Sequence, residues 1–163
     1  MKVIHLISGG DSGGAKTHVL SLLRNLNETI TAQLVCFRDG PFAQEARSLG
    51  IPVEIMGGNN IPRLRRQLTS YIKEGGYQLI HCHGSRANMV GALLRGSTGL
   101  PVVSTVHSDY KLDYMGRPFS HLTFGNINSW ALHRVDYRIG VSDAMVDLLI
   151  SRGFPPDRFY AIY

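Results

Sequence analysis

The residues best suited to chemistry lie in a glycine-rich segment close to the N-terminus. This segment, residues 9–17, reads Gly-Gly-Asp-Ser-Gly-Gly-Ala-Lys-Thr and follows an apolar run, residues 3–7. Glycines let backbone N–H groups approach a ligand without interference from side chains. An apolar periodicity after the segment predicts a helix, whose N-terminus favours negative charge. The sequence therefore predicts an anion site here, most often one for a phosphate, rather than a turn without a ligand.

Two familiar phosphate-binding patterns can be compared with this segment. The dinucleotide fingerprint needs glycine at its first, third and sixth positions, and the third position here is Asp11. The P-loop pattern, counted from the second glycine, fails only at Ala15, while Lys16 and Thr17 match it. A P-loop enzyme also needs an acidic residue at the end of another strand to hold magnesium, and the expected strands end in other residues. A P-loop nucleotidase that uses Lys16 and Thr17 remains an alternative interpretation.

A second group of polar residues is the run Ile-His-Cys-His-Gly at residues 80–84. On a strand, His81 and His83 share one face. They are suited to bracketing a sugar or binding a metal, and one of them is equally suited to bonding a backbone carbonyl in the core. A metal site is not expected, because only His107 or Asp109 stands out as a third ligand.

A third group is the run Ser-Thr-Val-His-Ser-Asp at residues 104–109. Histidine has an adaptable pKa and two ring nitrogens. We expect His107 to leave a buried strand at the ligand edge, where it can orient a hydroxyl or help to move a proton. A histidine that only caps the loop is the alternative.

Alternating strand and helix signals must position these groups. Strands are expected at residues 2–7, 31–37, 52–55, 78–83, 101–106, 137–141 and 158–162, and helices at 15–26, 41–49, 61–74, 85–95, 118–134 and 142–151. Such alternation predicts an α/β fold: a Rossmann-like, doubly wound parallel sheet of about seven strands with helices on both faces. Ligands of such sheets lie beyond the carboxyl ends of the strands, near the switch in strand order. All three groups of polar residues are therefore expected together at the carboxyl edge of the sheet.

Length and composition limit the number of domains, the class of partner and the cellular compartment. The chain has 163 residues, which predicts one domain, and 17 Lys and Arg against 12 Asp and Glu, which favours an anionic partner without choosing its class. No apolar run approaches the ~20 residues of a membrane span. Cys36 and Cys82 lie in apolar runs and are expected to be buried free thiols in a reducing compartment. These features predict a cytoplasmic protein, and an end inside an expected strand at Tyr163 predicts a fragment of a longer one.

The expected helix at residues 61–74 has a basic side. An apolar stripe faces one way, and Arg63, Arg66 and Lys73 lie together on another side. Most such basic sides are simply solvated. Contact with an anionic membrane surface, at the inner face of the membrane, is the sharper interpretation.

The order of these motifs resembles the N-terminal, acceptor-binding domain of family 4 glycosyltransferases with the GT-B architecture. The resemblance covers nearly the whole chain. It rests on Gly13-Gly14-Ala15-x-x-His18, on the run at residues 80–84, on Thr105-Val106-His107-Ser108-Asp109, and on Val141-Ser142.

This resemblance implies two Rossmann-like domains that face a cleft, with residues 1–163 forming the first. The second domain, outside this chain, would hold most of a UDP- or GDP-sugar, which is a co-substrate; no bound cofactor, metal or nucleic acid is implied. The implied activity is that of a retaining hexosyltransferase of polysaccharide biosynthesis acting on a glycan or lipid-linked acceptor. The chain alone is expected to be inactive, and a non-catalytic Rossmann-like binding module remains an alternative.

The resemblance also assigns roles to residues. It places His107 against the transferred sugar as the catalytic residue, and Gly13 and Gly14 against a donor or acceptor phosphate. Lys16 stands where family members often carry Glu or Gln; we expect it near the same phosphate, and a lysine that only points to solvent is the alternative. The cleft is expected to be lined by His18, His83, Ser108, Asp109 and Ser142.

Overall fold

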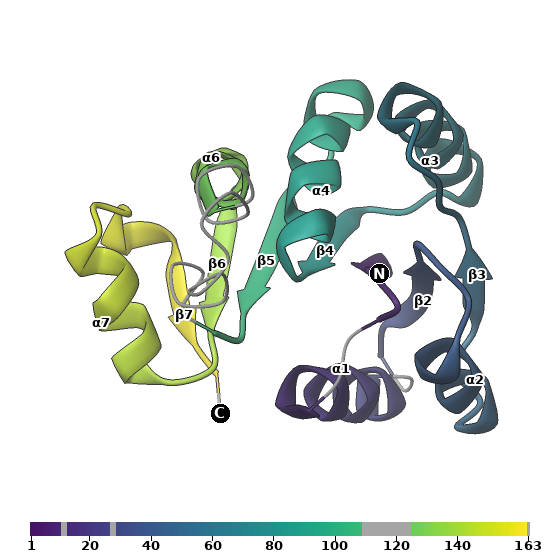
Figure 1. Ribbon diagram of the computed structural model, residues 1–163, viewed down its shortest axis with the longest axis horizontal. Helices are drawn as coiled ribbons and strands as arrows, with labels where there is room; N and C mark the ends of the chain where they lie inside the picture. Colours follow the sequence, from purple (N-terminus) through teal and green to yellow (C-terminus); the bar gives the residue numbers. More distant parts are fainter. Residues whose placement is uncertain (11–12, 27–28, 109–124, 163) are drawn as a thin grey trace.

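A parallel sheet of seven strands runs through the molecule in the order β3-β2-β1-β4-β5-β6-β7 (Figure 1). The computed structural model describes residues 1–10, 13–26, 29–108 and 125–162. The strands are β1 (Lys2–Ile7), β2 (Thr31–Cys36), β3 (Val53–Ile55), β4 (Leu79–His83), β5 (Val102–Val106), β6 (Tyr137–Gly140) and β7 (Phe159–Ala161). All neighbouring strands pair in parallel, as the alternating pattern predicted.

Helices cover both faces of this sheet (Figure 1). They are α1 (Gly13–Asn25), α2 (Pro41–Ser48), α3 (Ile61–Gly75), α4 (Ser85–Thr98), α6 (Asn126–Arg134) and α7 (Asp143–Ser151), with a short 3-10 turn at Pro156–Arg158. Helices α1 and α2 pack on one face, called the α1 face, and α3 and α4 pack on the other, called the α4 face. Helix α7 packs beside β6 and β7. The Rossmann-like fold is therefore confirmed.

Strand alternation decides which side chains reach each face. On β1, Ile4 and Leu6 enter the apolar cluster of the α4 face, whereas Ile7 enters that of the α1 face. On β4, Ile80 and Cys82 likewise belong to the α4 face. Because successive side chains point to opposite faces, His81 and His83 of β4 turn their imidazoles toward the α1 face. The two faces therefore differ: one is apolar along both central strands, and the other becomes polar toward their carboxyl ends.

The switch in strand order lies between β1 and β4. These two strands are neighbours in the sheet, but the chain leaves β1 toward β2 and leaves β4 toward β5 on opposite sides. A single residue, Gly84, turns the chain from β4 into α4, and its φ of 85° lies in the left-handed region that favours glycine. The first turn of α4 therefore begins directly at the carboxyl edge, where ligands of such sheets bind.

Two helices differ in part from their predicted bounds. Helix α4 runs to Thr98 rather than Arg95, because Gly96 continues the helix and the left-handed Gly99 ends it. The helix expected from residue 118 is described from Asn126, and residues 118–124 lie outside the described part.

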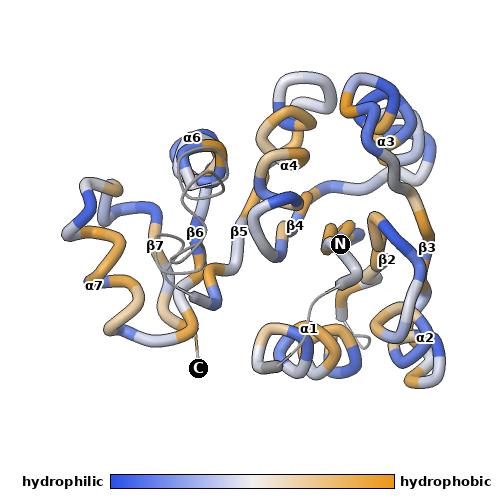
Figure 2. Tube along the Cα trace, in the orientation of Figure 1, coloured by the Kyte–Doolittle hydropathy of each residue, from blue (hydrophilic) through white to orange (hydrophobic). Residues whose placement is uncertain are grey.

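Helix α3 has the two sides that its sequence predicted, and Figure 2 shows its many hydrophilic residues in blue. Leu64, Leu68 and Ile72 are buried against the sheet. The exposed positions include Arg63, Arg66 and Lys73. Within the described part of the chain, no helix is both long and apolar enough to span a bilayer.

Candidate functional site

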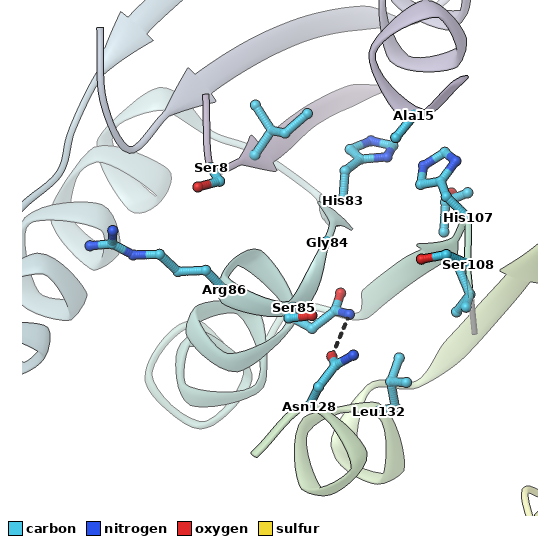
Figure 3. Close-up of a pocket in the computed structure, with 14 residues that line it drawn as sticks. Ser8, Ala15, His83, Gly84, Ser85, Arg86, His107, Ser108, Asn128 and Leu132 are labelled. Atoms are coloured by element: carbon cyan, nitrogen blue, oxygen red, sulfur yellow. Dashed lines mark hydrogen bonds between the residues drawn. The ribbon is translucent and has the colours of Figure 1, made fainter. Parts of the chain in front are cut away.

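A pocket of about 310 Å³ opens at the carboxyl edge of the sheet, where β1 and β4 meet (Figure 3). Its walls come from the end of β1, the first turns of α1 and α4, the ends of β4 and β5, and α6. The lining residues are Ile7, Ser8, Ala15, His83, Gly84, Ser85, Arg86, Asn88, Thr105, Val106, His107, Ser108, Asn128 and Leu132. None of these described lining residues is a carboxylate, so the pocket wall that they form is neutral to positive.

Five of the seven histidines of the chain form one connected array beside this pocket. From the core outward, the ring centroids of successive members lie 4.8 Å, 4.3 Å, 5.9 Å and 4.9 Å apart, in the order His5, His81, His83, His107 and His18. Strands β1 and β4, the turn after β5, and helix α1 each contribute to it. The array therefore joins the sheet interior to the rim of the pocket.

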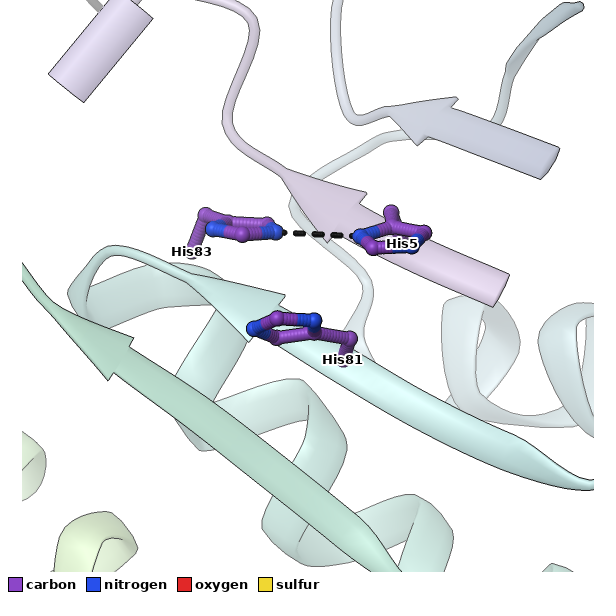
Figure 4. A group of neighbouring side chains, drawn as sticks. All are labelled: His5, His81 and His83. Atoms are coloured by element: carbon purple, nitrogen blue, oxygen red, sulfur yellow. Dashed lines mark hydrogen bonds between the residues drawn. The ribbon is translucent and has the colours of Figure 1, made fainter. Parts of the chain in front are cut away.

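The inner three rings are held by short polar contacts (Figure 4). Nδ1 of His5 and Nε2 of His83 share a hydrogen bond of 3.1 Å, and Nε2 of His81 lies 2.7 Å from Oγ1 of Thr105. The ring of His81 stacks on that of His83. All three side chains are buried, and Nδ1 of His83 has no hydrogen-bond partner among the described residues. The three packed imidazoles thus leave one buried ring nitrogen of the pocket residue His83 unpaired among the described residues.

Burial keeps these imidazoles uncharged. It lowers the pKa of His5 to about 4, and together with the nearby His18 it lowers the pKa of His107 to about 4. Burial and then the neighbouring rings hold the pKa of His81 and His83 well below the usual value. A neutral imidazole offers one donor and one acceptor, which matches a sugar hydroxyl. A general base works best with a pKa near the working pH, so His107 is better suited to orienting a hydroxyl than to removing its proton.

His5 is the member of the array that sequence reasoning missed. It sits inside an apolar run, but the register of β1 and β4 pairs it directly with His81. Ligand atoms of His5, His81 and His83 lie within 4.8 Å of one another, so a third potential metal ligand does exist. Three of the ring nitrogens already have partners, however: Nδ1 of His5 and Nε2 of His83 bond each other, and Nε2 of His81 lies 2.7 Å from Oγ1 of Thr105. The geometry fits a hydrogen-bonded core cluster.

A second polar network fixes the opposite wall of the pocket. Oγ of Ser104 donates to Oδ1 of Asn88 at 2.6 Å, and Nδ2 of Asn88 donates to Oδ1 of Asn128 at 3.0 Å. These buried groups tie β5, α4 and α6 together. Sequence reasoning missed both asparagines, because their partners lie far away along the chain.

Several predicted site residues do come together. His83, His107 and Ser108 line the pocket, and His18 contacts the ring of His107 edge-on. Gly13 and Gly14 open α1 directly before the pocket residue Ala15. A Cβ added at Gly14 would meet only open space, so a ligand can approach the backbone there.

Other predicted residues lie elsewhere. The ammonium group of Lys16 pairs with Glu45 of α2, and Lys16 does not line the pocket. Ser142 caps α7 by accepting a hydrogen bond from the backbone N–H of Met145 at 3.2 Å. Asp109 falls outside the described residues.

Comparison with known proteins places this architecture in a family. The profile described as Glycosyltransferase Family 4 matches residues 12–163. The chain belongs to glycosyltransferase family 4. It is also 31% identical over 108 residues to the protein EpsF of Bacillus subtilis strain 168, a match that covers 62% of this chain and 28% of that protein.

Solved structures with the same fold are more distant in sequence. HepE of Anabaena in complex with UDP-glucose has a TM-score of 0.83 at 22% identity, over 100% of this family 4 chain and 43% of HepE. A UDP-GlcNAc 2-epimerase from Neisseria meningitidis bound to UDP-GlcNAc has a TM-score of 0.73 at 14% identity, over 99% of this chain and 46% of the epimerase. The chain thus spans less than half of each of these neighbours.

The buried imidazoles predict a pH-dependent stability. The unfolded chain binds protons on histidine below about pH 6.5, whereas folded His5 does so only near pH 4. The free energy of unfolding should therefore fall as the pH drops from 6.5 to 4, with His5 alone contributing ~3 kcal/mol of that loss. Urea unfolding of the parent and of His5→Gln at several pH values measures this, and the variant should show a pH slope shallower by up to ~1.4 kcal/mol per pH unit.

The exposed Gln67 provides the control. Gln67→Ala should keep the slope of the parent, because an amide side chain does not titrate in this pH range. Equal slopes for His5→Gln and the parent would show that His5 is not held neutral by burial.

Proposed function

We propose that this chain is the acceptor-side, N-terminal domain of a retaining glycosyltransferase. The enzyme would transfer a hexose from a nucleotide sugar to a glycan or lipid-linked acceptor, and a second Rossmann-like domain would hold most of the donor. Family membership supports the reaction class. This chain covers only 43% of HepE, which supports the proposal of a second domain. HepE was solved in complex with UDP-glucose, which favours a UDP-sugar over a GDP-sugar as the donor. The pocket lined by His83 and His107 carries the proposal.

The pocket suggests how donor and protein would meet. The unobstructed backbone at Gly14, at the start of α1, suits a phosphate of the donor. His107 lies on the same side of the sheet, with its Nε2 buried and without a partner among the described residues. A sugar hydroxyl would supply that partner, because unpaired buried polar atoms are costly. His107 would therefore orient the transferred sugar next to the phosphate that it leaves.

The same residues favour a front-side step, in which the acceptor attacks from the face that the diphosphate leaves, over double displacement. Double displacement needs a carboxylate nucleophile, and the described lining residues include none. The low pKa of His107 makes it a weak base at neutral pH. In the proposed step the bond from the sugar C1 to the diphosphate breaks, the acceptor oxygen bonds to C1 on the same face, and the acceptor proton passes to the departing diphosphate. Catalysis would then come from positioning and from stabilising the leaving group.

The P-loop alternative is less well supported. That mechanism needs a lysine directed at the β- and γ-phosphates, whereas Lys16 pairs with Glu45. Magnesium-dependent ATP binding that is lost in Lys16→Ala would nevertheless favour it. A non-catalytic binding module would show no donor turnover at all.

We also propose that the enzyme works at the cytoplasmic face of a membrane, with α3 toward the lipid. The apolar residues of α3 are buried in the core, so its exposed arginines and lysine would act through charge alone. Each basic residue near an anionic surface contributes about 1 kcal/mol. A lipid-linked acceptor would then lie close to the pocket.

The transferase proposal predicts a large effect at His107. The test uses the protein at the length that its gene encodes, with UDP-glucose, UDP-galactose, UDP-GlcNAc and GDP-mannose as donors and nucleoside diphosphate release as readout. His107→Ala should lower turnover about 100-fold, because a displaced sugar loses its alignment, while the donor dissociation constant changes far less. His133→Ala is the matched control and should keep full turnover; unchanged turnover in His107→Ala would remove His107 from the mechanism.

The membrane proposal predicts salt-sensitive binding to anionic vesicles. The variant with Arg63, Arg66 and Lys73 all changed to Gln should bind phosphatidylserine-containing vesicles about 100-fold more weakly, from ~3 kcal/mol of lost attraction. Sedimentation with vesicles measures this, and neutral phosphatidylcholine vesicles are the control. Equal binding of the parent to both kinds of vesicle would contradict the proposal.

A further inference from the structure

The pocket contains an arginine for which the proposed reaction has no role. Arg86 lies in the first turn of α4 and is half-buried. Its Nη2 donates to the carbonyl of Gly58 at 2.7 Å, and its Cζ lies 5.5 Å from the centre of the Phe37 ring. These contacts hold the guanidinium in place yet use only part of its five N–H donors. No carboxylate of the described residues pairs with it, so its charge is uncompensated at the edge of the pocket, and Figure 3 shows the side chain extending away from His107 and Asn128.

The residues around Arg86 offer further donors and no acid. The N-cap of α4 is Gly84, so no side chain caps the first N–H groups of the helix, and its first turn holds no acidic residue. Gly84, Ser85 and Arg86 all line the pocket. His83 directly precedes them, lines the pocket and is 1% exposed, and its buried Nδ1 has no hydrogen-bond partner among the described residues. When His5 donates to Nε2 of His83, that Nδ1 carries a proton and is a donor as well.

This combination is the chemical complement of an oxyanion. Arginine forms strong, often bidentate hydrogen bonds to phosphate and carboxylate groups, and the N-terminus of a helix favours the same charge. A neutral hydroxyl would leave the guanidinium without a counter-charge. The polar groups of residues 83–86 therefore fit an anionic ligand better than a neutral sugar.

The position of Arg86 separates this anion from the donor diphosphate. Figure 3 shows Arg86 and Ala15 on opposite sides of the pocket. Ala15 belongs to α1, on the face of the sheet where the donor phosphate is proposed, whereas Arg86 belongs to α4, which packs on the other face. One diphosphate beside Gly14 would leave Arg86 without a partner.

We propose that the Arg86 side of the pocket binds an oxyanion of the acceptor, a phosphoryl or carboxylate group, while the His107 side receives the transferred sugar. The inference rests on the proposed function, since it takes the pocket to be the acceptor site. It narrows the acceptor to a charged molecule: a sugar phosphate or phosphate-linked glycan, or an acidic sugar.

The test measures binding of three probes that share one ring: glucose 6-phosphate, glucuronate and glucose. Isothermal titration uses the protein at the length that its gene encodes, with UDP present to fill the donor site. At least one anionic probe should bind about tenfold more tightly than glucose, and Arg86→Gln should remove that advantage. Binding of the phosphate alone identifies a phosphoryl acceptor, and binding of the uronate alone identifies an acidic sugar.

Two further variants guard against a purely structural effect. Arg24→Gln removes an exposed arginine from the last turn of α1, outside the pocket, and should change nothing. Arg86→Lys keeps the charge without the planar fork, and should recover part of the anion affinity. The proposal is overturned if Arg86→Gln binds the anionic probes like the parent, if UDP competes with them, or if no anionic probe binds better than glucose.

Measuring donor turnover distinguishes a failure of the acceptor-subsite proposal from a failure of the transferase proposal. If UDP-sugars are turned over but Arg86 has no effect on anion binding, the acceptor subsite fails and the proposed function stands. If no donor is turned over but anion binding depends on Arg86, the transferase proposal fails and the anion site stands.

Discussion

The pairing of β1 with β4 is the constraint on which the pocket depends. Its register sets His5 opposite His81 and Ile7 opposite His83, and it lets His5 and His83 share a hydrogen bond inside the sheet. Neutral imidazoles carry one donor and one acceptor each, and this bond satisfies one nitrogen of each of the two rings. A slip of one residue would turn the apolar side chains of both strands toward the polar side. The apolar α4 face therefore fixes the register that assembles the imidazole wall.

The same strand order brings two helix N-termini to one opening from opposite faces of the sheet. Helix α1 begins at Gly13, and a single residue, Gly84, separates β4 from α4. Both N-termini favour negative charge, yet the imidazole array lies on the α1 side and Arg86 on the α4 side. A donor phosphate and an acceptor anion can thus be held apart while the sugar lies between them. In this account the fold separates the two substrates, and individual side chains select them.

Local patterns were enough to predict the sheet, its helices and the edge at which the pocket opens, because burial and turn residues repeat regularly along the chain. They also predicted that His81 and His83 share a face. They could not predict His5 as a member of the array, since its hydrogen-bond partner lies 78 residues away and its own surroundings are apolar. The same limit applies to Lys16, whose partner Glu45 comes from another helix. Pairings between distant elements had to be seen in three dimensions.

The central claim is that the imidazole-lined pocket holds the transferred sugar. The most direct measurement is a nuclear Overhauser experiment on the protein at the length that its gene encodes, with bound UDP-glucose labelled in its glucose ring. The account predicts magnetisation transfer between the glucose protons and the ring protons of His107. A bound glucose whose protons contact only residues outside this pocket would contradict it.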